Sequence, residues 1–244
     1  MRLFKILLCL AAVLSCQTLY AEPAAEMAVT YERTQVQAPS CEGPECPEVT
    51  FDVVRFVGLP KLDQYVDHEL LKQAYREPGQ ADPSSLEAYQ KQFLAEAKPG
   101  WSSLLHSNVL GQHIGLVVLA LSSYNFTGGA NGESGLSYLH YERSTERWLS
   151  LPDFFIEGQE PAFWQLVQQA HQQWLQTNKF DQDASFTETW PFSRTDNVAF
   201  LEAQVVLSYP VGQLGPNYLG NVQLSINYDK LHGIVKPQFI PPSE

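Results

Sequence analysis

The stretch that most constrains the fold is residues 124–155, YNFTGGANGESGLSYLHYERSTERWLSLPDFF. It reads as the end of one strand, a glycine-rich turn, a second strand, a polar turn and an aromatic exit. Residues 135–143 place Leu, Tyr, His and Glu on one face and Ser, Leu, Tyr and Arg on the other. Such alternation is typical of a β-strand. The sequence therefore predicts a β-hairpin around which the rest of the chain is organised.

The segment before this hairpin also has strand character. Residues 115–123 (GLVVLALSS) are almost continuously apolar, which predicts a central strand that is covered on both faces. Gly111 and Gln112 are predicted to form a two-residue hairpin turn between strands over residues 101–110 and 113–126. Residues 49–56 (VTFDVVRF) are predicted to form an earlier strand.

Helical periodicity predicts helices over residues 59–75, 84–97 and 161–178, since apolar residues recur there at three- and four-residue spacing. Further strands are expected over residues 197–201, 204–209 and 221–226. Runs of helices and strands that are segregated in this way favour an α+β fold. We expect an antiparallel sheet with helices packed on one side. The fold should divide into an N-terminal lobe over residues 46–156 and a C-terminal lobe over residues 157–241.

The N-terminus is predicted to be a targeting segment. Arg2 and Lys5 precede a short apolar run, residues 6–14, which is too short to span a bilayer. Residues 13–16 (VLSC) resemble a bacterial lipobox. We therefore expect a signal peptide over residues 1–15 and a lipid anchor on Cys16. With Gln17 after the cysteine, an outer-membrane lipoprotein facing the periplasm is expected. The alternative is cleavage at Ala21, which would release a soluble periplasmic protein.

Residues 16–45 are expected to form a mobile, lipidated tether, with order beginning near Cys46. Cys41 and Cys46 are close in sequence, and Gly43 and Pro44 lie between them. An oxidising compartment favours a disulfide between these cysteines. The alternative, half of a metal site, lacks a second cysteine pair and a nearby histidine.

The formal net charge of -12 limits the classes of partner. Residues 1–21 contain two basic residues and no acidic residue, so the exported part is more acidic still. Such a surface repels phosphate backbones, which argues against nucleic-acid binding. It would attract a cationic partner, although the acidity also serves solubility alone.

No catalytic signature is complete in the sequence. Ser134 lies in G-E-S-G, which is one residue short of a nucleophile elbow. His68 and Glu69 lack the second histidine of a zinc peptidase, since position 72 is Lys72. His140 and Glu142 share a strand face but have no third ligand. We expect no catalytic residue, no metal and no cofactor. Carboxylates that act on glycan cannot be recognised without distances, so a hydrolase stays open as an alternative.

The predicted hairpin is the best candidate for ligand binding. The candidate residues are Tyr124, Thr127, Gly128, Gly129, Asn131 and Tyr138. Glycines expose backbone N–H groups and allow a partner to approach closely. The structural alternative is that the glycines only permit a positive φ in the turn and that the tyrosines only pack within the sheet.

At this stretch the sequence resembles the extracellular domain of RsiV-type anti-sigma factors. The resemblance is carried by Tyr124, by residues 127–130 (TGGA), by the strand with Tyr138 and Tyr141, and by residues 149–155 (LSLPDFF). Residues 209–212 (YPVG) and 216–220 (PNYLG) resemble a later loop of that family. Asn131 stands where the family usually has histidine. We expect neither the transmembrane helix nor the cytoplasmic segment through which that family controls sigma factors.

The resemblance implies a domain that recognises a ligand in the cell envelope. RsiV binds lysozyme, and related domains precede peptidoglycan deacetylases. We therefore expect a non-enzymatic, periplasm-facing lipoprotein whose partner is a cationic protein such as lysozyme, or peptidoglycan. The alternatives are an envelope hydrolase that acts on peptidoglycan or glycan, and a structural component of the envelope.

Overall fold

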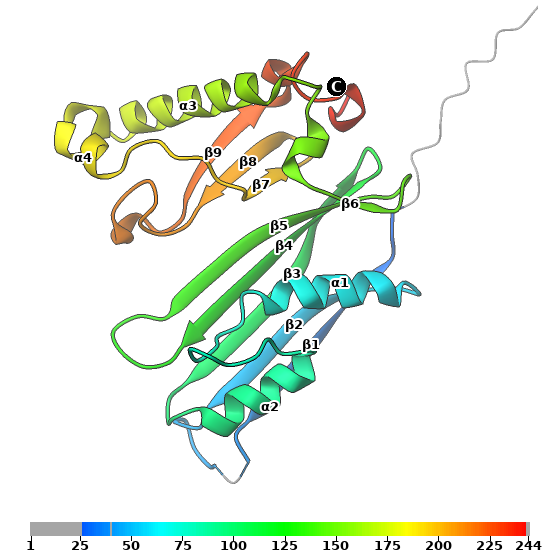
Figure 1. Cartoon of the computed structure of the whole chain (residues 1–244), viewed down its shortest axis with the longest axis vertical. Coiled ribbons are helices and arrows are strands. Elements are labelled where there is room, and N and C mark those ends of the chain that lie inside the picture. The colour runs from blue at the N-terminus through cyan, green and yellow to red at the C-terminus, as the bar shows by residue number, and fades with distance from the viewer. Residues whose placement is uncertain (1–25, 40, 243–244) are drawn as a thin grey trace, which may run out of the picture.

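The computed structural model describes residues 26–39 and 41–242 as an α+β fold with two sheets (Figure 1). The large sheet has six strands in the order β1-β2-β3-β4-β5-β6, and the small sheet has three in the order β7-β8-β9. The predicted fold class is confirmed. The strands are β1 (Val29–Gln37), β2 (Glu48–Phe56), β3 (Ser102–His113), β4 (Leu116–Phe126), β5 (Glu133–Glu142), β6 (Arg147–Leu149), β7 (Val198–Phe200), β8 (Gln204–Tyr209) and β9 (Val222–Asn227).

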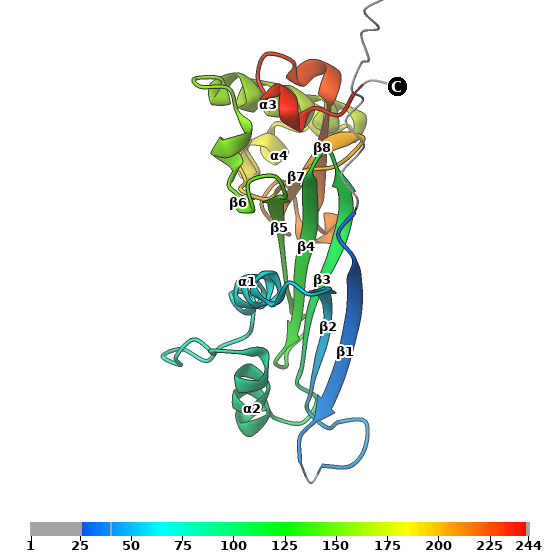
Figure 2. The ribbon, with the colours of Figure 1, turned by 90° about the vertical axis from the view of Figure 1, so that its right-hand side faces the viewer.

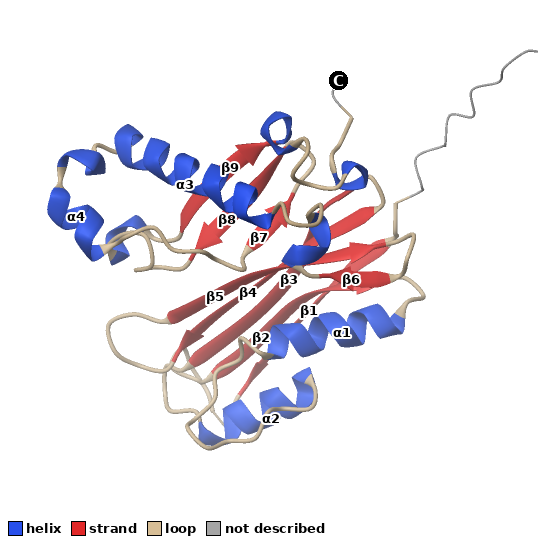
Figure 3. Ribbon diagram, turned by 45° about the horizontal axis from the view of Figure 1, so that its top comes forward, coloured by secondary structure: helices blue, strands red, loops and turns tan. Residues whose placement is uncertain are grey.

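The helices divide between the two sheets. Helices α1 (Pro60–Leu71) and α2 (Leu86–Glu96) lie on the same side of the large sheet (Figure 2). On the opposite side, no described helix covers β1 to β3. Helix α3 (Glu160–Thr177) packs against β9 of the small sheet and is followed by α4 (Ala184–Thr189) (Figure 3). Part of the large sheet therefore keeps an open face.

Strand β4 contributes to both hydrophobic cores, as its unbroken apolar run predicts. Leu116 and Val118 pack in the core that includes the small sheet and α3. Val117, Leu119 and Leu121 pack on the other face, in the core beneath α1 and α2. Alternate residues of a strand point to opposite faces, so one strand serves two cores. The predicted central strand, covered on both faces, is confirmed.

The prediction of order beginning near Cys46 is wrong. Residues 29–37, which fall within the expected tether of residues 16–45, form β1 and pair antiparallel with β2. The strand is mostly exposed and polar, so its sequence lacks the apolar alternation of a half-buried strand. Cys41 and Cys46 form a disulfide in the connection between β1 and β2. The predicted signal peptide, Cys16 and Ala21 lie outside the described residues.

Two details of the predicted strand pairing also differ. Strands β2 and β3 pair parallel, because α1 and α2 form a crossover connection between them. The other pairs in both sheets are antiparallel. The turn between β3 and β4 is not at Gly111 and Gln112 but at Ile114 and Gly115, both of which have positive φ. Gly111 instead follows an irregularity in the register of β3.

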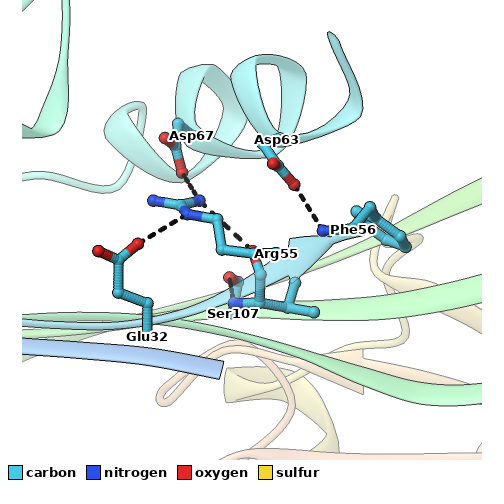
Figure 4. Close-up of polar contacts among 7 residues, drawn as sticks. Glu32, Arg55, Phe56, Asp63, Asp67 and Ser107 are labelled. Atoms are coloured by element: carbon cyan, nitrogen blue, oxygen red, sulfur yellow. Dashed lines mark hydrogen bonds and ion pairs between the residues drawn. The ribbon is translucent and has the colours of Figure 1, made fainter. Parts of the chain in front are cut away.

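Charged side chains fix helix α1 to the edge of the large sheet (Figure 4). Arg55 on β2 contacts Asp67 of α1 through Nη1 at 2.8 Å and Glu32 of β1 through Nε at 3.1 Å. Asp63 of α1 accepts a hydrogen bond from the backbone N–H of Phe56 at 2.8 Å. Burial raises the pKa of Asp67, against the opposing effect of Arg55. Helix α1 therefore has a fixed position over the sheet. In the described ranges, no helix has the length and apolarity needed to cross a membrane.

Candidate functional site

A cleft of about 330 Å³ lies where the outer edge of β5 faces the small sheet and the end of α1. This volume is at the lower end of the usual range for small-ligand sites. We call it the β5 cleft. Its lining consists of Glu69, Lys72 and Gln73 at the end of α1, Ser134, Gly135, Leu136 and Ser137 on β5, and Asn197, Ser208, Tyr209, Pro210 and Asn221 of the C-terminal lobe.

The outer edge of β5 is free in the cleft because β6 is only three residues long. Strand β6 pairs with β5 at residues 140–142 and does not reach residues 133–139. The backbone C=O of Leu136 accepts a hydrogen bond from Asn197 Nδ2 at 2.8 Å, so this group points away from β4. Alternate residues of an antiparallel strand direct their backbone groups to the same side. Ser134 and Leu136 therefore turn their N–H groups toward the cleft.

Gln73 places an unpaired acceptor in the lining. Its Nε2 donates to Ser137 Oγ at 2.7 Å and to the backbone C=O of Leu121 at 3.3 Å. Its Oε1 is buried and has no hydrogen-bond partner among the described residues. Gly135 permits this packing, since a Cβ there would lie 2.7 Å from Gln73 Oε1. A side chain at position 135 would therefore push Gln73 out of place.

Tyr209 is the second residue of the cleft with an unpaired polar atom. The residue is fully buried, and its hydroxyl has no hydrogen-bond partner in the described part of the chain. Burial raises the pKa of this hydroxyl, so it stays protonated and can donate. An unsatisfied buried polar group costs free energy, and each such case in a native structure calls for an explanation. A polar ligand that pairs with Gln73 and Tyr209 would explain both.

The cleft contains one ion pair. Lys72 Nζ lies 2.7 Å from Glu69 Oε1 and 2.8 Å from Oε2, so each neutralises the other. The remaining side chains of the lining are uncharged. Glu133, which is exposed, lies at the start of β5 beside the cleft. The interior of the cleft is therefore suited to the neutral polar groups of a ligand, and its rim beside Glu133 is suited to a positive charge on that ligand.

The predicted ligand-binding residues lie beside the cleft, not in its lining. Tyr124 pairs with Ser134 across β4 and β5 and is 43% exposed. Its ring lies against Gly132, where a Cβ would be 2.5 Å from the ring carbon Cζ. The loop between β4 and β5 thus packs against the Tyr124 ring at Gly132. The absence of a side chain at position 132 is thus explained by the ring of Tyr124.

The loop between β4 and β5 is exposed at its tip. Gly128 and Gly129 have φ of 97° and 92°, a region that favours glycine. Asn131 is exposed. Thr127 is half-buried and lies beside the hydroxyl of Tyr75. The loop is accessible to a partner, and its glycines also meet the conformational need of the turn.

Tyr138 lies apart from the other candidates, at the junction of the two lobes. Its hydroxyl is 2.8 Å from Ser208 Oγ, and its ring packs against the core of the C-terminal lobe. It lines a second cavity of about 270 Å³ together with His140. His140 Nε2 accepts a hydrogen bond from the backbone N–H of Phe200 at 3.1 Å. Burial, with a smaller effect of His113, lowers the pKa of His140 to about 3, so the ring is neutral. Tyr138 therefore joins the lobes.

The other motifs considered from the sequence lie within strand β5 or in the core. Ser134 lies within β5, between residues of a strand and not at a strand-to-helix turn. His140 and Glu142 both lie on β5, and His140 is buried among Phe154 and Phe200. Among residues 26–39 and 41–242, no three histidine, cysteine, aspartate or glutamate side chains gather in a way that could hold a metal ion.

Sequence reasoning missed the residues that make the cleft. Gln73, Asn197 and Asn221 come from segments that are far apart in sequence, and only the packing of the lobes brings them to β5. Tyr209 and Pro210 belong to a motif that carried the resemblance, and this signal could have pointed to them. The loop predicted to bind a ligand and the cleft share the strand β5.

Comparison with known proteins gives a consistent set of similarities. A family described as "Protein of unknown function (DUF3298)" matches residues 152–229. The crystal structure of a DUF3298 family protein from Pseudomonas aeruginosa PAO1 is 42% identical, covers 90% of this chain and 99% of its own, and has a TM-score of 0.84. A DUF3298 member from Bacteroides fragilis NCTC 9343 has the same fold at 16% identity, with 88% and 95% covered and a TM-score of 0.65. No curated protein matches the chain.

Proposed function

The chain belongs to the DUF3298 family, and from that premise we propose that it is a non-enzymatic recognition domain of the cell envelope. It binds a partner at the β5 cleft and the adjoining loop between β4 and β5. The resemblance to RsiV-type extracellular domains makes a cationic protein such as lysozyme the first candidate partner. Peptidoglycan is the second.

The observation that carries this proposal is the polar character of the β5 cleft. Gln73 Oε1 and the Tyr209 hydroxyl are buried without partners, and both residues line it. Glu69, the carboxylate of the lining, is bound to Lys72 and so is not poised as a general base. Groups that can hydrogen-bond a ligand, without a paired nucleophile and base, support recognition over catalysis.

Charge supports a cationic partner. The chain has 27 acidic and 15 basic residues. Opposite charge on a partner speeds association, and this attraction weakens as salt screens it. We expect binding to lysozyme that is strong at low salt and weaker at moderate salt. Tyr124 adds an exposed aromatic ring beside the cleft, and tyrosine is enriched at the contact residues of protein interfaces.

The test is binding of the whole chain to lysozyme and to purified peptidoglycan, measured by biolayer interferometry at two salt concentrations. Tyr124→Ala should weaken binding by about tenfold, since aromatic hot spots cost roughly 1–2 kcal/mol or more when truncated. Tyr31→Ala is the matched control. Tyr31 is also an exposed tyrosine of the large sheet, at 55%, but it lies on β1 at the opposite edge.

Two results would contradict the proposal. The first is the absence of binding to both lysozyme and peptidoglycan at low salt. The second is release of sugar or peptide from peptidoglycan that is lost when a single aspartate or glutamate is replaced, which would establish the hydrolase alternative. Equal effects of Tyr124→Ala and Tyr31→Ala would move the binding surface away from the hairpin.

We further propose that Cys16 carries the lipid anchor and that the domain faces the periplasm from the outer membrane. The lipobox at residues 13–16 and Gln17 support this localisation. Labelling with radioactive palmitate should mark the wild type and not Cys16→Ala. Labelling of neither protein, with a mature N-terminus after Ala21, would instead support a soluble periplasmic protein.

A further inference from the structure

We propose that the β5 cleft captures a short extended peptide segment of the partner, which pairs with the free edge of β5 as an added strand. This inference deepens the recognition role proposed above and rests on it. The occupant is a positively charged peptide without proline at the paired positions.

The free edge of β5 offers backbone groups to an extended peptide. Ser134 and Leu136 direct their backbone groups into the cleft, and β6 does not reach them. Among these groups, the C=O of Leu136 accepts a hydrogen bond from Asn197. The N–H groups of Ser134 and Leu136 have no partner in the described ranges. Exposed strand edges bind extended peptides through main-chain hydrogen bonds. The spacing of these groups, two residues along a strand, is that of a peptide backbone.

Two residues of the lining each carry an unpartnered polar atom. Gln73 Oε1 is a hydrogen-bond acceptor and the Tyr209 hydroxyl is a donor, and neither atom has a partner within the described residues. Gln73 belongs to the helix side of the cleft, and Tyr209 belongs to the side of the C-terminal lobe. An extended peptide carries an N–H donor and a C=O acceptor at each residue and turns them to both sides. The peptide can therefore offer hydrogen-bond partners to Gln73 on one side and Tyr209 on the other, while its backbone pairs with the edge of β5.

The shape and charge of the cleft limit the size and the charge of its occupant. Asn197 closes one end by its bond to Leu136, while the other end opens beside Glu133 and the loop between β4 and β5. The occupant is therefore a short segment and not the edge of a second folded sheet. The cation of the cleft, Lys72, is neutralised by Glu69. The exposed carboxylate of Glu133 at the open end favours a basic residue of the peptide next to it.

The test uses random octapeptides displayed on phage, selected on the immobilised whole chain and then synthesised. Selected peptides should be basic, should lack proline at the paired positions, and should protect the amides of Ser134 and Leu136 from hydrogen exchange. Ser134→Pro should weaken them at least tenfold, because proline removes an N–H that points away from β4. Ser134→Ala keeps this N–H, so it should bind the selected peptides at least fivefold more tightly than Ser134→Pro does.

The outcomes separate this inference from the proposed function. Lysozyme binding that is equal in the wild type and Ser134→Pro, with no selected peptide that protects these amides, would overturn the peptide mode and leave recognition standing. Peptides that bind at the cleft while lysozyme and peptidoglycan do not would support the mode and refute those ligands. Protection of the same amides by N-acetylglucosamine oligomers and not by peptides would overturn the inference in favour of glycan.

Discussion

At the scale of single residues, the β5 cleft combines order with unsatisfied polar atoms. Gln73 is held by Ser137 and Leu121 through its nitrogen, which leaves the oxygen unpaired. Gly135 makes this possible by leaving room for the side chain. Sites that bind polar ligands commonly carry such a cost in the free protein, because the groups are satisfied only in the complex. The cost should be measurable in the stability of variants.

Tyr209→Phe should raise the free energy of unfolding by about 1 kcal/mol, because it removes a buried hydroxyl without a partner and keeps the ring. The same substitution should weaken ligand binding. Urea denaturation followed by fluorescence measures the first effect.

Tyr228→Phe is the control for this prediction. The hydroxyl of Tyr228 is also in a buried residue, but it donates to the backbone C=O of Leu201 at 2.7 Å. Its loss should lower stability by about 1–2 kcal/mol, since the carbonyl is left unpaired. If both variants shift stability in the same direction, the hydroxyl of Tyr209 is not an unsatisfied group.

At the scale of elements, the position of α1 decides where Gln73 lies. The helix carries its apolar stripe over the sheet, with Leu62, Val66 and Leu70 buried. Packing alone does not fix a helix along its own axis. Arg55 and Asp63 supply this, since they connect fixed points of β1, β2 and α1. The position of Gln73 in the cleft therefore depends on contacts that join α1 to β1 and β2.

Arg55→Ala should lower the free energy of unfolding by about 1–2 kcal/mol. The side chain of Arg55 is 23% exposed and its loss leaves the partly buried carboxylate of Asp67 unpaired. Arg33→Ala is the matched control. Arg33 also bonds an aspartate of the sheet, Asp52, but its side chain is 64% exposed, so the loss should stay below about 0.5 kcal/mol. Equal losses in urea denaturation would show that Arg55 does not anchor α1.

The elements differ in how far their sequence determines them. The apolar run of β4 and the stripe of α3 predict both elements, because each pattern has one stable solution in a core. Strand β1 could not be predicted this way, since it is exposed and depends on pairing with β2. Gly111 misled the turn prediction because a glycine inside a strand also marks an irregular register.

The site shows the same limit more strongly. Tyr124 and Asn131 could be proposed from the sequence because a glycine-rich turn between strands is a local feature. Asn197 and Tyr209 could not be assigned to the same cleft, since their approach to β5 follows from the packing of the two sheets. A local motif therefore gave candidate residues that lie beside the β5 cleft, and none that line it.

At the scale of the whole molecule, the two lobes are joined by buried groups. Strand β4 supplies both cores. Between β5 and β7, His140 accepts a hydrogen bond from the backbone N–H of Phe200 and packs edge-on against the stacked rings of Phe154 and Phe200. This contact requires a neutral imidazole, because a protonated ring has no acceptor. The junction of the lobes is therefore sensitive to acid.

Stability should fall as the pH is lowered from 7 to 4.5. Burial lowers the pKa of His140 to about 3, while the unfolded side chain titrates near its ordinary value of 6.5. Between these pH values the unfolded state binds more protons than the folded state. The contribution of the neutral His140 to stability is therefore fully present above about pH 6.5 and is lost as the pH falls toward 3. The contribution of His140 to this loss is on the order of 2 to 3 kcal/mol at pH 4.5.

His140→Gln should reduce this dependence on pH, because glutamine can accept the same hydrogen bond and does not titrate. His68→Gln, at an exposed position, should leave the dependence unchanged. Urea denaturation at a series of pH values measures both. If the wild type and His140→Gln lose the same stability between pH 7 and 4.5, another group governs the acid response.

The shortness of β6 has a consequence for self-association. An uncovered strand edge is a template on which identical chains can add without limit. Here the end of α1 and the C-terminal lobe stand on either side of the free part of β5. They leave space for a single narrow segment and exclude a second copy of the sheet. The same walls that shape the cleft thus keep this exposed edge from seeding a polymer.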